Sequence, residues 1–321
     1  MGEKSIMAFF NKYTMISLAL SFLVGVGQTA TALAVNPGWA SSQNSAYWTG
    51  LTFNHSRMLV KLTVQVQIQS PAPMADGFLT RMGAGLTGCS ETVEEMKLMA
   101  VDMRAEGLSF FDEQYTEKIW FNAGDGRAYR RIRWRKEGDP WVKSYCWTDD
   151  GVRRQKIQPA SRDESKQAPI KWTQTTESFY PHPKNTVYSE AISDPTLLLY
   201  LLSVLEPRNM KSPFEIYVFG KEQLHRLTCR QEKSLPMAVS FKIHSSSGVV
   251  GINTTIKPLV FSIEAEPLAS KGRKPETFSL LGLQKEIRIY LDPSRHLPIR
   301  VSGRNSTYGE LILDLSDARL D

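Results

Sequence analysis

Residues 194–206 read Asp-Pro-Thr-Leu-Leu-Leu-Tyr-Leu-Leu-Ser-Val-Leu-Glu, and Pro207 follows directly. Asp194 is a residue type that caps helix N-termini, and Pro195 suits a first helical turn, where no amide hydrogen is needed. Because Pro207 ends the pattern, the sequence predicts a short helix over residues 195–206. This helix is apolar on nearly every side, so other parts of the chain must enclose it. The leucines expected to form this apolar plug or lid are Leu197, Leu198, Leu201, Leu202 and Leu205.

Strand patterns surround this helix in the sequence. From Leu62 to Ile68, apolar residues alternate with Thr63, Gln65 and Gln67. This period of two indicates a strand with one polar face. Other β-prone runs follow at a spacing typical of antiparallel sheets, separated by segments rich in Gly, Asp and Pro. These runs are 93–105, 118–122, 128–135, 141–147 and 152–157 before the helix, and 214–219, 224–231, 239–244, 259–265, 286–291, 299–302 and 310–315 after it.

The predicted fold class is therefore mainly β. We expect an antiparallel curved sheet or a partly open barrel, with the one short apolar helix packed in its concave side. Residues 35–58 form an N-terminal segment in this prediction, and residues 59–321 form the β-rich, barrel-like domain. Residues 158–193 are polar and contain several prolines, which indicates a connection between two lobes.

The first 34 residues have the features of a secretory signal peptide. Lys4 and Lys12 supply a positively charged start, the apolar stretch from Tyr13 to Val26 follows, and Ala32-Leu33-Ala34 offers a cleavage site. The sequence thus predicts export to the periplasm, with the mature protein peripheral to the membrane at most. The alternative is an uncleaved N-terminal segment that anchors the protein to the inner membrane.

Net charge indicates which partners the protein favours, and the cysteine count limits the number of disulfides. The net charge of +6 favours anionic partners without requiring nucleic acid, and export removes nucleic acid as the usual ligand. Three cysteines, Cys89, Cys146 and Cys229, allow at most one internal disulfide and leave one thiol free. The sequence leaves open which pair, if any, is joined.

Catalytic and metal-binding motifs are weak or absent in the sequence. Residues 83–88 match a dinucleotide-binding fingerprint, but the preceding segment is not the buried strand that this motif needs. The sequence contains no serine nucleophile elbow, metalloprotease helix motif or phosphate-binding loop, and its five histidines are scattered. We therefore expect no catalytic residues, no metal and no cofactor.

The most distinctive local feature is a basic run within residues 127–136. Strand alternation places Arg131, Arg133 and Arg135 on one face, and Arg153 follows two strands later. Arginine forks suit phosphate, sulfate and carboxylate oxygens, so these four arginines are the predicted site for an anionic ligand. The alternative is a solvated outer face that neighbouring acids neutralise.

Three segments of the C-terminal half resemble the bacterial family called domain of unknown function 3108. They are Asp194–Leu202, then Ile287–Asp292 together with Leu297–Val301, and finally Tyr308–Leu311. The resemblance covers roughly Leu59 to Leu315, and its motifs are short. It implies an exported, β-rich protein of Gram-negative envelopes with no established catalytic residues. It also implies an architecture similar to lipocalins or to lipoprotein carriers of the LolA kind.

Two functions follow as hypotheses. The first is a periplasmic or envelope binding or carrier protein for a lipid-like or other amphipathic anionic ligand. The alternative is a non-catalytic envelope interaction module, which binds an anionic polysaccharide or a protein partner through the basic strand face.

Overall fold

The computed structural model describes residues 46–57, 60–70, 96–106, 113–183, 192–204, 212–268 and 275–320. The chain divides into two compact units, residues 1–31 and 32–321, and every described residue belongs to the second unit. The predicted signal peptide, Cys89 and Leu205 lie outside the described residues. Within the described part of the chain, the helices are too short to cross a membrane.

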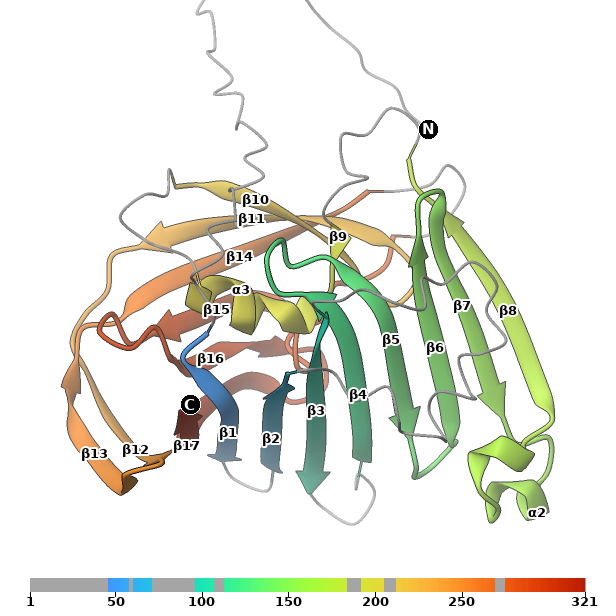
Figure 1. The fold of residues 1–321 in the computed structure, drawn as a ribbon, viewed down its shortest axis with the longest axis horizontal. Helices are drawn as coiled ribbons and strands as arrows, with labels where there is room; N and C mark the ends of the chain where they lie inside the picture. Colours follow the sequence, from blue (N-terminus) through green and yellow to red (C-terminus); the bar gives the residue numbers. More distant parts are fainter. Residues whose placement is uncertain are drawn as a thin grey trace, which may run out of the picture. The chain divides into compact units, whose positions relative to one another are not determined.

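The fold is mainly β, as predicted, and consists of one large, curved sheet that does not close (Figure 1). Its strands are β1 (Trp48–Arg57), β2 (Val60–Gln69), β3 (Met96–Glu106), β4 (Glu113–Asn122), β5 (Ala128–Arg135), β6 (Trp141–Thr148), β7 (Gly151–Gln158), β8 (Gln174–Pro181), β9 (Ile192–Ser193), β10 (Phe214–Phe219), β11 (Leu224–Glu232), β12 (Met237–Ser245), β13 (Gly248–Ile256), β14 (Leu259–Pro267), β15 (Lys285–Leu291), β16 (Pro298–Asn305) and β17 (Gly309–Leu320). The helical elements are α2 (Arg162–Ser165), η1 (Pro169–Lys171), η3 (Pro195–Leu197) and α3 (Leu198–Val204).

The strand order joins an N-terminal meander to the C-terminal strands through β1. Strands β1 to β8 pair in chain order, and β1 also pairs with β17, where Leu51 lies opposite Ala318. From β17 the sheet continues through β16, β15, β14, β11 and β10 to β9. The hairpin of β12 and β13 joins the end of β17. Among the described residues, the main strand order therefore ends at β8 and β9, and β13 is a further edge.

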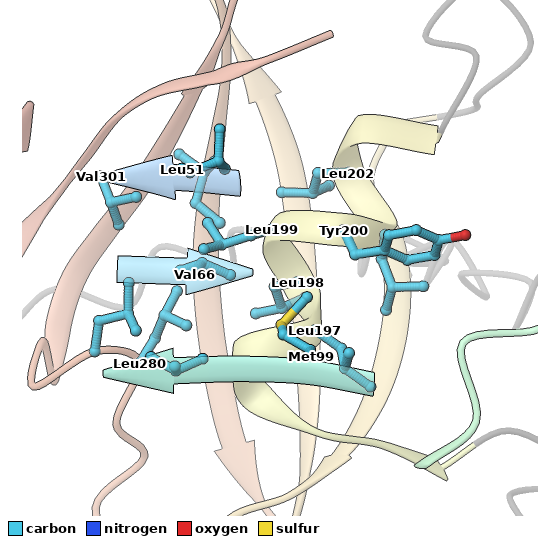
Figure 2. Packing of buried hydrophobic residues seen from close by; sticks show 14 of the residues in the cluster. Leu51, Val66, Met99, Leu197, Leu198, Leu199, Tyr200, Leu202, Leu280 and Val301 are labelled. Carbon is cyan, nitrogen blue, oxygen red and sulfur yellow. The ribbon is translucent and has the colours of Figure 1, made fainter. Parts of the chain in front are cut away.

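The apolar helix lies where the sequence predicts it, in the concave side of the sheet (Figure 1). The Asp194 side chain accepts a hydrogen bond from the Thr196 amide at 2.9 Å and so caps the helix. All residues from Leu197 to Leu202 are buried. Figure 2 shows Leu199 pointing towards Leu51 and Val66, with Leu198 beside Met99. Each such leucine contributes about 1.5–3 kcal/mol by leaving water.

Polar side chains and one glycine fix the position of α3. Trp48 Nε1 donates a hydrogen bond to Ser203 Oγ at 3.0 Å, and the Tyr200 hydroxyl donates to the Ala123 carbonyl at 3.2 Å. Gly126 has a φ of +70°, and a Cβ there would lie 2.3 Å from Leu201 Cδ2. This glycine therefore allows both the tight turn after β4 and the close approach of α3.

Cys229 is the free thiol among the described cysteines, whereas Cys146 is disulfide-bonded. Cys229 lies buried on β11, and burial raises the pKa of its thiol. We expect a maleimide to leave Cys229 unlabelled in the native protein and to label it after unfolding, as intact-mass measurement would show. A Leu235→Cys variant, whose new thiol replaces a side chain that is 83% exposed, is the control and should react at once. Rapid native labelling of Cys229 would contradict the burial.

Candidate functional site

A buried charge cluster lies on the concave side, where the basic run of β5 faces the start of the helix. Strand alternation points Arg131 and Arg133 to this side, as the sequence predicts, and Glu117 of β4 lies directly opposite Arg133. The Arg131 side chain is only 2% exposed. The cluster is Glu117, Arg131, Arg133 and Asp194.

Arg131 connects β5 to the other end of the sheet. Its Nη1 lies 2.6 Å from Asp194 Oδ2, and its Nη2 donates a hydrogen bond to the Gly220 carbonyl at 2.5 Å. Its guanidinium carbon lies 4.0 Å from the centre of the Tyr145 ring. Asp194 precedes η3 and Gly220 follows β10, so this one side chain ties β5 to the helix and to β10.

The acids of the cluster are shared among the cations. Glu117 Oε1 lies 3.7 Å from Arg131 Nε and 3.3 Å from Arg133 Nε. Burial lowers the pKa of Arg133, but the adjacent Glu117 carboxylate outweighs this effect and raises it above its ordinary value. Burial also raises the pKa of Asp194, to about 6, against the opposing charge of Arg131. Asp194 is thus largely ionised at neutral pH and pairs with Arg131.

Further side chains join the two ends of the sheet next to this cluster. Arg154 of β7 pairs with Glu222, which follows β10, and donates a hydrogen bond to Ser178 of β8 at 3.1 Å. The Phe219 ring lies 5.4 Å from the Tyr180 ring, with Tyr145 and Trp147 also in contact. Side-chain contacts therefore bridge β6–β8 and β10, whereas the described residues show no backbone register between β8 and β9.

The cavity at this cluster is small. It measures about 30 Å³ and is lined by Tyr115, Glu117, Arg131, Arg133, Asp194 and Thr196, among others. A single water needs roughly 10–15 Å³ by the same measure. The cavity has room for about two or three waters, so the interior of the cluster is not a site for a larger ligand.

A larger pocket, of about 320 Å³, lies between strands β1–β3 and α3. Its size falls within the ~300–1,000 Å³ range of ligand sites. Trp48, Ile68 and Tyr200 provide apolar surface, while Gln69 and Lys97 provide polar groups. Lys97 is half-buried, and its Nζ lies 5.9 Å from the centre of the Tyr200 ring. Lys97 forms no ion pair with an acid in the described ranges.

The structure brings together only some of the four arginines predicted to bind an anion. Arg131 and Arg133 are neighbours, and Arg135 follows at the end of β5, where it donates two hydrogen bonds to the Asp139 carbonyl. Arg153 lies on the opposite face of the sheet, 5.2 Å from the Phe179 ring and 3.8 Å from Asp150.

Sequence reasoning missed the residues that share a site with these arginines or line the pocket. Asp194 was recognised as a helix cap but not as an ion-pair partner. The other missed residues are Glu117 and Lys97. Strand alternation could have placed Glu117 with Arg133, but only once the register between β4 and β5 was known.

No family model matches the chain, and no curated protein or solved structure matches it either. The resemblance to the domain of unknown function 3108 family therefore stays a prediction. Among the described residues, no group of three or more His, Cys, Asp or Glu side chains could hold a metal ion.

Proposed function

We propose that this protein binds or carries an amphipathic anionic ligand, with an apolar chain and one negatively charged head, in the pocket beside α3. The pocket of about 320 Å³ between β1–β3 and the buried helix is the observation that carries this proposal. In this proposal the protein acts in the periplasm, as the predicted signal peptide and the family resemblance imply.

The lining of the pocket supports a ligand with two different ends. Trp48 and Ile68 offer an apolar wall that would cover a hydrocarbon chain. Lys97 offers a cation that has no acidic partner in the described part of the chain. A carboxylate or phosphate head would supply that partner, because a half-buried charge is most stable when paired.

The alternative function, an interaction module that uses the basic strand face, has less support. Arg131 is 2% exposed and is bound by Asp194, so a large partner would not reach it. Arg153 lies on the other face of the sheet and would not join the same surface.

Calorimetric titration of the purified protein with dodecanoate, below the concentration at which it forms micelles, tests the proposal. We expect binding, and we expect Lys97→Gln to weaken it by about tenfold or more, because a desolvated charged hydrogen bond contributes ~1.5–3 kcal/mol. Ile68→Trp should also weaken binding, since the larger ring fills the pocket. Lipid extraction followed by mass spectrometry would identify the natural ligand.

The matched control is Lys242→Gln, which removes an exposed lysine from β12, outside the pocket. It should bind dodecanoate as the wild type does. The proposal fails if the wild type does not bind, or if Lys97→Gln and Lys242→Gln have equal effects.

A further inference from the structure

Three cations lie directly opposite one another across neighbouring strands. Arg133 of β5 is opposite Lys143 of β6, and Lys143 is opposite Lys156 of β7. Glu117 is opposite Arg133 on the other side. Directly opposed residues have Cβ atoms about 4.5–5.5 Å apart, where like charges are destabilising. This row therefore concentrates positive charge at a cost to the folded state.

A second row lies two residues further along the same face. Here Arg131, Tyr145 and Arg154 are opposite one another on the same three strands. We call Arg133, Lys143, Arg154 and Lys156 the cationic patch. Tyr145 adjoins it between the two rows.

The described acids do not neutralise the cationic patch. Glu117 is shared between Arg133 and Arg131, and Glu222 pairs with Arg154. Neither Lys143 nor Lys156 forms an ion pair with any described acid. Lys143 instead lies over the Trp141 ring, 4.5 Å from its centre.

The surroundings of Lys143 also disfavour its charge. Burial first, and then the positive charges of Arg154, Arg133 and Lys156, lower the pKa of Lys143 to about 8, against the weaker pull of Glu222. A dianion placed beside Lys143 would reverse this effect and restore its proton.

Buried donors at the patch also lack acceptors. The Tyr145 hydroxyl is fully buried and has no hydrogen-bond partner among the described residues. The Nε atom of Arg154 is likewise buried without a hydrogen bond. Buried polar groups are normally paired, so these two unpaired donors beside one group of cations point to an acceptor that approaches from outside the chain.

We propose that the cationic patch is a binding site for a phosphate group, held by Arg133, Lys143, Arg154 and Lys156 with Tyr145 as an added donor. Guanidinium forks and lysine ammonium groups together suit a tetrahedral dianion. The site is formed by β5–β7, whereas the pocket of the proposed function is formed by β1–β3 and α3. It is a second site and does not depend on the proposed function.

Calorimetric titration with inorganic phosphate and with glycerol 3-phosphate, against sodium chloride at equal ionic strength, tests this site. We expect phosphate to bind and the wild-type protein to take up protons at roughly pH 8.5, just above the pKa of about 8 for Lys143. Two buffers with different ionisation enthalpies would reveal the uptake. Tighter binding of glycerol 3-phosphate would indicate a phosphate ester as the ligand, and tighter binding of inorganic phosphate would indicate the free ion.

Two variants make the test specific. Lys143→Gln should weaken phosphate binding by about tenfold or more and abolish the proton uptake, and Lys156→Gln should weaken binding while keeping some uptake. Lys242→Gln, on β12, is again the control and should change neither. The proposal is overturned if phosphate binds no better than chloride, or if Lys143→Gln binds phosphate as the wild type does.

Stability without phosphate provides a second measurement. The pKa of Lys143 is about 8 in the folded protein and 10.5 ordinarily, so between these values the unfolded chain holds a proton that the folded protein lacks. The contribution of Lys143 to stability should therefore rise with pH across this window. Lys143→Gln should abolish this increase of stability with pH. It should also raise the denaturation midpoint at neutral pH, because it removes a charge that Arg133, Arg154 and Lys156 repel. A lower midpoint would contradict this repulsion.

Discussion

Replacing Asp194 with alanine is expected to lower the free energy of unfolding by about 3–5 kcal/mol. Asp194 is fully buried, and its carboxylate lies 2.6 Å from Nη1 of Arg131. Its loss leaves a buried guanidinium with only Glu117 as a more distant counter-charge. The helix also loses its cap, which contributes about 1 kcal/mol. Urea denaturation followed by circular dichroism measures the change.

Two further variants separate these contributions. Asp194→Asn keeps a cap acceptor for the Thr196 amide but removes the negative charge. This variant should therefore keep the stabilisation from the helix cap and lose the stabilisation from the ion pair. Arg131→Leu combined with Asp194→Asn should be less destabilised than the sum of the two single variants, because the pair no longer leaves one charge unpaired. Additive effects would show that the ion pair does not couple the two residues.

Replacing Leu199 with alanine is expected to destabilise the protein by about 2–5 kcal/mol. Leu199 has no exposed surface and packs in the centre of the concave side, near Leu51 and Val66 (Figure 2). Its truncation removes apolar contact and leaves a cavity that the strands around α3 would only partly fill. The loss should appear as a lower urea midpoint, while the dependence of the unfolding free energy on urea concentration stays unchanged.

The control for this prediction is Leu235→Ala. Leu235 is 83% exposed, so its truncation should change stability by less than ~0.5 kcal/mol. If Leu199→Ala were as mild as Leu235→Ala, the helix would not be the centre of the core.

Local sequence was sufficient for much of the fold. The Asp-Pro start of the helix and its apolar length predicted a buried helix, because capping and enclosure are set by nearby residues. The run 128–135 was predicted with the bounds that β5 has. Its alternation also placed Arg131 and Arg133 on one face correctly.

Some strands were missed because their sequences carry little apolar alternation. Sequence analysis predicted no strand at β1, β8 or β13. Strands β8 and β13 are mostly exposed, so they carry little apolar alternation. The apolar residues of β3 do not alternate cleanly, because both faces are buried near its start: Met99 packs in the concave core, whereas Leu98 packs with Trp120 and Trp172 in a second cluster.

The candidate sites required three-dimensional information, because they depend on strand register and on helix packing. Lys143 and Lys156 meet Arg133 only through the register of β5, β6 and β7. Lys97 meets Tyr200 because α3 packs beside β3. No local pattern in the sequence encodes either contact.

The pairing of β1 with β17 also bears on how the protein is made. Ser316 of β17 donates a hydrogen bond to the Thr52 carbonyl of β1, 264 residues earlier. At synthesis rates of ~5–20 residues per second, β1 would wait roughly 13–53 s for this partner. During that interval its apolar face needs temporary cover, so a nascent chain would benefit from a chaperone until translation passes residue 320.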